Sequence, residues 1–320
     1  MDKVILLREK KVYSRLALTV AITWILGLFF QIAWAFLLRG VPAVADSAVV
    51  EWLSMLLPLY LFAFPIGLTF VKNLPEHVPA RRRISAGEAF RILCICVFLM
   101  YAGAIIGDAL AAWLSGGSAT NIVHETAMGT EAQWMKFLVL VVCVPFMEEI
   151  MFRKVILDRV RIYGETKAIV FSALAFGLFH MNFYQFFYAM FVGALLAYLY
   201  LRTGNILIPY LYHAFVNLVG GFLPVVMSSL SGEGGMTGSI FDMLHPDQTL
   251  YLLPTLFYVG ILALFFLGLI FFLCSFRKLS FGGADSAPKH GSFFSAVVMN
   301  AGFLCLVLLS GIMSAFSLTV

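Results

Sequence analysis

Two adjacent glutamates, Glu148 and Glu149, lie inside the apolar run VPFMEEIMFRKVI at residues 144–156. Glu149 precedes Arg153 by four residues, which is the favourable order and spacing for an ion pair on one helix face. Glu148 points about 100° away around the helix and has no such partner in its own segment. A desolvated carboxylate beside another carboxylate is suited to accept a proton from water, so Glu148 is a candidate general base.

Two of the six histidines, His180 and His213, also fall in apolar segments. Phe176 and His180 are four residues apart in FGLFH, and His213 and Asn217 are four apart in HAFVN, so each pair shares a helix face. His180 could share a proton with the glutamates or bind a water. His213 and Asn217 could donate hydrogen bonds to a developing oxyanion, or a histidine could ligate a metal. Ionisable groups inside a bilayer are costly and usually mark function.

A helical hairpin around Gly164 would bring these side chains together. Glu148 lies 16 residues before this glycine and His180 lies 16 residues after it. With a rise of ~1.5 Å per residue, an antiparallel hairpin places both residues at the same depth. The helix that carries the glutamates is expected to extend beyond the membrane and to end at Gly164.

The composition shows where these helices must lie. The chain is 62% hydrophobic and 12% charged, whereas average soluble domains are roughly 25% charged. Apolar runs of ~17–25 residues recur, long enough to cross a ~30 Å hydrocarbon core as helices. We therefore expect an all-α polytopic membrane protein, with residues 1–320 forming a single integral membrane domain, and not a β-barrel.

Nine membrane helices are expected, or eight with one re-entrant segment. Their ranges are 16–38, 49–71, 90–114, 134–161, 166–182, 185–202, 206–228, 251–276 and 293–318. With a cytoplasmic N-terminus and an external C-terminus, 19 of the 21 basic residues fall on the cytoplasmic side, as the positive-inside rule requires. The basic residues thus mark topology and lipid contact, and no nucleic-acid partner is expected. The external loops, at 115–133 and 231–248, contain no Lys or Arg.

The three polar motifs resemble those of a known family. EEIMFR, FGLFH and HAFVN occur in this order on successive apolar segments, and they resemble the EExxxR, FxxxH and HxxxN/D motifs of the CPBP family of intramembrane proteases. That family includes the type 2 CAAX prenyl endopeptidases and the bacterial Abi-type bacteriocin-immunity proteins. The resemblance covers residues 135–218, within expected catalytic core helices at 134–228. It implies a bundle with a polar, conical catalytic cavity open to the cytoplasmic side.

The resemblance also implies roles for the motif residues. Glu148 would activate a water with His180, while His213 and Asn217 would form the oxyanion site. The supporting residues would be Glu149, Arg153 and Phe176. The cofactor stays open between zinc, held by Glu148, His180 and His213, and a glutamate-activated water without metal. The HExxH pattern of the zincin metalloproteases is absent.

The expected function is that of an endopeptidase in a bacterial cell membrane, acting near the cytoplasmic face on a membrane-associated peptide or protein. CAAX-like processing, bacteriocin or membrane-peptide processing, and self-immunity all fall within this class. Two alternatives remain, a proton- or ion-coupled transporter and a catalytically silent binding or immunity protein. The sequence shows neither an inverted repeat nor the paired broken helices typical of transporters.

Overall fold

The computed structural model describes residues 2–41, 47–118, 121, 133–230, 249–276 and 294–319, and all regular structure within these ranges is helical. Most of the two expected external loops, residues 122–132 and 231–248, lies outside the described residues. The basic residues 277, 278 and 289, expected on the cytoplasmic side, lie outside them as well.

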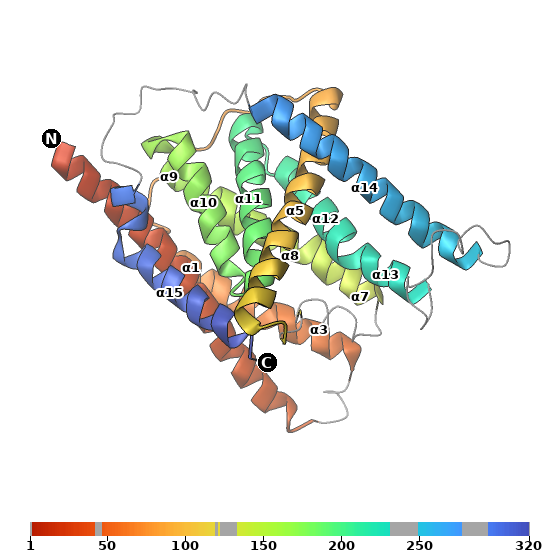
Figure 1. Cartoon of the computed structure of the whole chain (residues 1–320). Helices are drawn as coiled ribbons and strands as arrows, with labels where there is room; N and C mark the ends of the chain where they lie inside the picture. The colour runs from red at the N-terminus through yellow and green to blue at the C-terminus, as the bar shows by residue number, and fades with distance from the viewer. Residues whose placement is uncertain are drawn as a thin grey trace.

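In chain order we divide the helices into three groups, and Figure 1 labels most of the α-helices. The first contains α1 (Asp2–Leu38), α3 (Ala48–Leu56), η1 (Leu57–Ala63), α4 (Phe64–Thr69) and α5 (Ala86–Ser115). The second contains α7 (Gln133–Lys136), η2 (Phe137–Cys143), α8 (Val144–Glu149), η3 (Ile150–Leu157), α9 (Asp158–Val160), η4 (Arg161–Tyr163), α10 (Glu165–Phe179) and α11 (Phe183–Thr203). The third contains α12 (Leu207–Asn217), η5 (Leu218–Phe222), α13 (Leu223–Leu230), α14 (Thr249–Phe276), η8 (Phe294–Val298) and α15 (Ala301–Phe316).

Each of the nine expected ranges overlaps helices of the structure. Among the described residues, 6 helical segments are long and apolar enough to cross a membrane: 6–38, 52–69, 86–115, 183–203, 207–229 and 252–275. Three expected spans are not among them. Lys136 and the charges of the EEIMFR motif interrupt the apolar run of 134–161, and α10 and α15, within 166–182 and 293–318, are only 15 and 16 residues long. The chain is therefore an all-α polytopic membrane protein.

Prolines determine where several helices widen. The π-helical segments η1, η2 and η5 each end two residues before a proline, namely Pro65, Pro145 and Pro224. Proline has no N–H, and its ring crowds the carbonyl four residues earlier, so it disturbs the α-helical ladder on its N-terminal side. A π-helical turn contains one more residue than an α-helical turn and is frequent at functional sites. The continuous helical segment from α7 to η4, which we call the site helix, therefore carries a proline-linked π segment one α-helical turn before the two glutamates.

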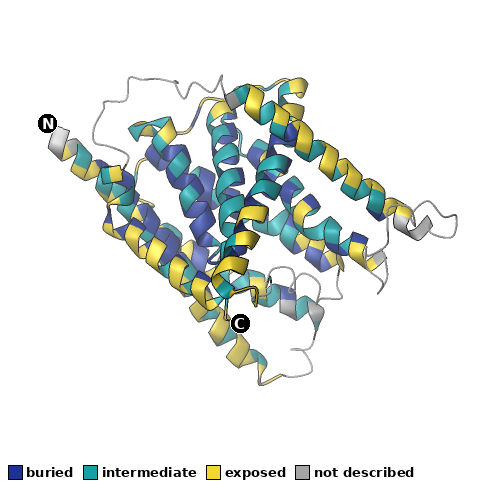
Figure 2. Cartoon of the chain, in the orientation of Figure 1, coloured by how far each residue is buried: buried dark blue, intermediate teal, exposed yellow. Residues whose placement is uncertain are grey.

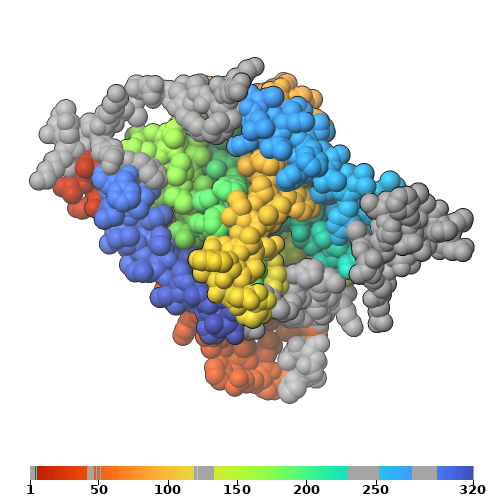
Figure 3. Space-filling model, in the orientation of Figure 1, coloured from red at the N-terminus to blue at the C-terminus, as the bar shows by residue number. Residues whose placement is uncertain are grey.

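The α10–α11 hairpin occupies the centre of the bundle, where Figure 2 shows mostly buried positions. α5 packs closely along α11, because Gly103 and Gly107 approach the backbone of α11. A Cβ at Gly107 would lie 2.6 Å from the carbonyl oxygen of Phe183. α14 packs on the outer side of α5, and α15 packs against α1. In the view of Figure 3, α5, α14 and α15 form much of the near surface.

Residues 70–85, which we call the strap, join α4 to α5 across one end of the bundle. The guanidinium of Arg159 lies 2.7 Å from a carboxylate oxygen of Glu76 in the strap. The backbone N–H of Arg82 donates to the carbonyl of Thr203, at the end of α11, over 2.9 Å. The basic strap and the basic α9–α10 link thus lie at the same end, as the charge pattern predicts.

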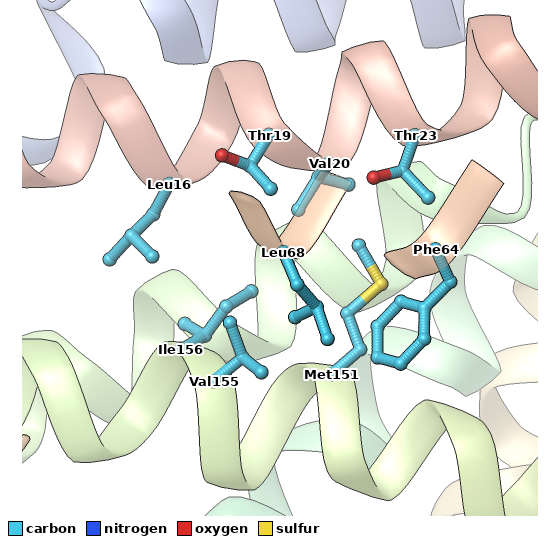
Figure 4. Close-up of a pocket in the computed structure, with 9 residues that line it drawn as sticks. All are labelled: Leu16, Thr19, Val20, Thr23, Phe64, Leu68, Met151, Val155 and Ile156. Atoms are coloured by element: carbon cyan, nitrogen blue, oxygen red, sulfur yellow. The ribbon is translucent and has the colours of Figure 1, made fainter. Parts of the chain in front are cut away.

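A small cavity of about 10 Å³ lies between α1, α4 and η3 (Figure 4). Thr23 of α1 is 1% exposed, and within the described part of the chain its hydroxyl has no hydrogen-bond partner. A buried water needs a cavity of ~10–15 Å³ or more, so this cavity is at the lower limit for one water.

Candidate active site

The buried ion pair predicted within EEIMFR is present. The Nε and Nη2 atoms of Arg153 lie 2.9 and 3.2 Å from the two carboxylate oxygens of Glu149. Nη1 of Arg153 donates to Ser172 Oγ over 3.1 Å, and this hydroxyl donates to the carbonyl of Phe152. Arg153 and Glu149 are both 0% exposed. A buried ion pair is tolerated when further hydrogen bonds satisfy its members, and Ser172 of α10 contributes one.

His213 lies between the two glutamates. Its Nδ1 is 3.0 Å from Glu149 Oε1, and its Nε2 is 3.5 Å from Glu148 Oε2. His213 is 4% exposed and Glu148 is 6% exposed, so the three groups interact largely out of solvent. An ionised carboxylate only accepts hydrogen bonds, so Nδ1 carries a hydrogen; only the imidazolium would donate from both nitrogens.

His180 caps the C-terminus of α10, and its Nδ1 lies 2.8 Å from the carbonyl oxygen of Phe176. A carbonyl can only accept, so Nδ1 must carry the hydrogen, and Nε2 of the neutral ring has a free lone pair. Among the described residues, no hydrogen bond joins His180 to Glu148. The hairpin between them turns at Gly164, whose φ of 123° ends η4, as the sequence predicts.

The turn after His180 is unusually tight. Met181 has a φ of 55° and is the one non-glycine residue with positive φ in the described part of the chain. Asn182 then caps α11, because its side-chain oxygen accepts from the backbone N–H of Gln185 over 2.9 Å. Unfavourable backbone conformations of this kind concentrate at functional sites.

Side chains from all three motifs contact or contribute the aromatic ring of Phe176. Its centroid is 5.0 Å from that of His180 and 5.5 Å from that of His213. The guanidinium carbon of Arg153 lies 5.3 Å from the same centroid. On α11, Gly193 leaves room for the ring, since a Cβ there would lie 2.8 Å from Phe176 Cδ1. The three motifs thus converge on one side chain.

Asn217 ends α12, one turn beyond His213. Its Nδ2 donates to the carbonyl of Leu140 in η2 over 2.8 Å, so one of its two N–H groups is engaged with the site helix. The second N–H has no hydrogen-bond partner within the described residues. The structure therefore places both polar residues of HAFVN, His213 and Asn217, against the helix that carries the glutamates.

One site residue has no motif to reveal it. The hydroxyl of Tyr60 in η1 lies 3.2 Å from Glu148 Oε1. The contact joins residues 88 positions apart, and the local sequence gives only one signal, a tyrosine between Pro58 and Pro65 in an apolar run.

The expected zinc ligands do not form a metal-binding group as placed. Across the described ranges, no group of three or more His, Cys, Asp or Glu side chains is arranged so that it could hold a metal ion. His213 faces the two carboxylates with its ring nitrogens, and His180 uses Nδ1 for Phe176.

Comparison with known proteins agrees with the motifs. A family model described as Type II CAAX prenyl endopeptidase Rce1-like matches residues 130–219. No curated protein and no solved structure matches the chain. The matched segment contains all three motifs and nearly coincides with residues 135–218, over which they resemble the CPBP proteases. The resemblance is therefore confirmed: residues 130–219 are similar to the type II CAAX prenyl endopeptidase Rce1-like family.

Proposed function

We propose that the protein is an intramembrane endopeptidase of the CPBP type, in which Glu148 and His180 activate a water molecule. The observation that carries the proposal is the meeting of all three motifs at one buried cluster, where the two glutamates have different surroundings. Glu149 is held by Arg153 and His213, whereas Glu148 has no guanidinium partner among the described residues. Glu148 is therefore the carboxylate available for proton transfer.

The water would donate one hydrogen to the Glu148 carboxylate and the other to Nε2 of His180. Both groups are acceptors, so the water would turn a lone pair toward the scissile carbonyl carbon. As the new C–O bond forms, Glu148 takes the water proton. It then returns this proton to the leaving nitrogen as the C–N bond breaks, so the base of the first step is the acid of the second.

The oxyanion of the tetrahedral intermediate would be stabilised by His213 and Asn217. The contact of His213 with Glu149 orients the ring. The 3.5 Å separation of Nε2 from Glu148 is at the limit of a hydrogen bond, so a protonated ring could redirect Nε2 to the oxyanion. Asn217 would offer the N–H that it does not donate to Leu140.

The substrate that we propose is a membrane-associated peptide or protein, cleaved near the cytoplasmic face of a bacterial membrane. The gathering of basic segments at one end of the bundle supports this orientation. The family match supports a CAAX-like C-terminus as one substrate class, and bacteriocin or other membrane-peptide processing as the broader one. Zinc held by Glu148, His180 and His213 remains the competing proposal for how the water is activated.

The test is cleavage of quenched-fluorescent peptides, with and without a prenyl group, by the purified protein in detergent. Glu148→Gln and His180→Ala should each lower kcat/KM by about 10²-fold or more, because each removes a water-binding acceptor. Glu165→Gln is the matched control, since that glutamate is partly exposed and pairs with Arg161 over 3.3 Å. It should leave cleavage within about 2-fold of the parent.

Two further arms decide between the alternatives. Loss of cleavage with a zinc chelator, restored by added zinc, would support the metal-dependent form. Equal activity of all three variants would refute the assigned roles. Proton or ion flux in liposomes that depends on Glu148, in a protein that cleaves no peptide, would replace the protease with a transporter.

A further inference from the structure

Tyr60 contacts the proposed general base from outside the segment that the family model matches. It lies in η1, and its hydroxyl is 3.2 Å from Glu148 Oε1. An ionised carboxylate has no hydrogen to donate, so Tyr60 donates and Glu148 accepts. A hydrogen bond to a charged acceptor is stronger than one between neutral groups.

This contact distinguishes the two carboxylate oxygens of Glu148. Oε1 accepts from Tyr60, while Oε2 faces Nε2 of His213 at 3.5 Å. Within the described chain, these are the two side chains that hold Glu148 by hydrogen bond or ion pair. Glu149 is held more firmly, by two nitrogens of Arg153 and one of His213. The orientation of Glu148 thus depends on a tyrosine from another helix.

The fold keeps Tyr60 in this place. η1 packs along α1, and the two helices approach closely at Gly27, where a Cβ would lie 2.7 Å from Cδ1 of Leu59. Pro58 is the second residue of the π-helical segment, and Pro65 lies two residues after its end. A turn widened between two prolines has a side-chain direction that an uninterrupted α-helix would not give. Tyr60 is the polar residue within this turn, and it faces the site.

We propose that Tyr60 is a positioning residue for Glu148 in the peptidase reaction, an inference that rests on the proposed function. By donating to Oε1, it fixes the carboxylate plane and leaves a lone pair on Oε2 directed at the water. Tyr60 does not itself touch the reacting atoms. The first group of helices therefore contributes to the chemistry, although it carries none of the three motifs.

The rival explanation is that Tyr60 only joins two helices. Tyr101 provides the matched control, because its hydroxyl also makes an interhelical hydrogen bond, to the carbonyl of Val219 over 3.4 Å. A purely structural tyrosine would affect the amount of folded protein and its unfolding temperature. A positioning tyrosine would in addition lower kcat with little change in KM, because the lost interaction matters most in the transition state.

The experiment compares Tyr60→Phe and Tyr101→Phe with the parent in the peptide cleavage assay, per mole of folded protein. We expect Tyr60→Phe to lower kcat by about 10-fold, with KM within about 2-fold, as for a lost hydrogen bond to a charged group. Tyr101→Phe should leave both constants within about 2-fold. A Tyr60→Phe variant that cleaves as the Tyr101→Phe control does would overturn the inference and leave the protease proposal intact.

A second measurement does not depend on cleavage. The unfolding temperature in detergent is measured for Tyr60→Phe, Glu148→Leu and the double variant, which form a double-mutant cycle. If Tyr60 holds Glu148, Tyr60→Phe lowers the unfolding temperature in the parent and has little further effect once Glu148 is replaced. Additive shifts would refute the inference even if no peptide is cleaved, an outcome that would count separately against the proposed function.

Discussion

Arg153 carries the positive charge that allows Glu149 to remain buried beside Glu148. Both members of the pair are 0% exposed, so neither charge can be solvated if its partner is removed. The sequence predicted this pair because its members lie four residues apart on one helix. It did not predict that His213 would contact the same carboxylate, because that contact joins residues 64 positions apart.

Replacing Arg153 with Met should therefore destabilise the protein by about 3–5 kcal/mol, since it leaves a carboxylate buried without a cation. The measurement is the free energy of unfolding, or the unfolding temperature, in detergent. Arg161→Met is the control, because Arg161 and Glu165 are both partly exposed, and it should cost about 0–1 kcal/mol. Adding Glu149→Leu to Arg153→Met should recover part of the loss; no recovery would contradict the pairing.

Tyr60 marks the limit of motif-based prediction at the residue scale. EEIMFR, FGLFH and HAFVN can be recognised because helical spacing links residues three or four apart. A hydroxyl that reaches the site from a distant helix leaves no such pattern. Only the packing of η1 on α1 and on the site helix brings Tyr60 to Glu148.

At the scale of elements, the α10–α11 hairpin determines how the histidines are presented. Phe176 of α10 has space for its ring because α11 has a glycine, Gly193, opposite it. Helix ranges could be predicted from apolar runs and from Gly164. The π-helical segments could not be predicted, because a proline indicates that a helix is disturbed but not how its backbone hydrogen bonds rearrange.

Gly193→Ala should lower kcat by about 10-fold or more, because the added Cβ displaces the ring that both histidines contact. Small displacements of catalytic groups are costly, and ~1 Å can reduce a rate about 10²-fold. Gly260→Ala in α14 is the control, since no atom lies within 4 Å of a Cβ at that position. The measurement is kcat in the peptide cleavage assay, calculated per mole of folded protein. Equal kcat values for the two variants would rule out the role given to Phe176.

Gly164→Ala tests the link between η4 and α10. The glycine has a φ of 123° and a ψ of 129°, a conformation that a residue with a Cβ adopts only with strain of about 1–3 kcal/mol. We expect the free energy of unfolding to fall by that amount. Gly87→Ala, at a glycine whose φ is not positive and with nothing within 4 Å of an added Cβ, should change it by less than about 1 kcal/mol. If the two substitutions lower the free energy of unfolding by similar amounts, a side chain at position 164 does not strain the backbone.

At the scale of the whole molecule, two helices that are far apart in the sequence, α1 and α15, pack against each other. α15 packs on α1, where the backbone N–H of Gly302 donates to Ser14 Oγ over 2.9 Å. The all-helical class and six of the nine expected membrane spans were readable from composition, because lipid requires long apolar runs whatever the fold. The pairing of α1 with α15 was not, since apolar helices of similar composition offer many alternative partners.

Gly302→Val should weaken this pairing, because its Cβ would contact the backbone of Ser14. Overpacking of this kind costs about 1–3 kcal/mol, which should appear as a lower unfolding temperature in detergent. Gly311→Val, on the same helix with nothing within 4 Å of its Cβ, is the control. If both variants unfold at the same temperature, the α1–α15 contact does not limit stability.

The hydrogen bond between Gly302 and Ser14 spans 288 positions, and it has a consequence for biosynthesis. α1 enters the membrane before α15, so the surface that α15 covers stays open until α15 itself has been translated. During that interval lipid, an insertase or a membrane chaperone must cover this surface. A ribosome stalled before α15 should therefore leave a nascent chain in which α1 lacks its partner helix. Quality-control proteases should recognise this exposed helix even when the active-site segments are intact.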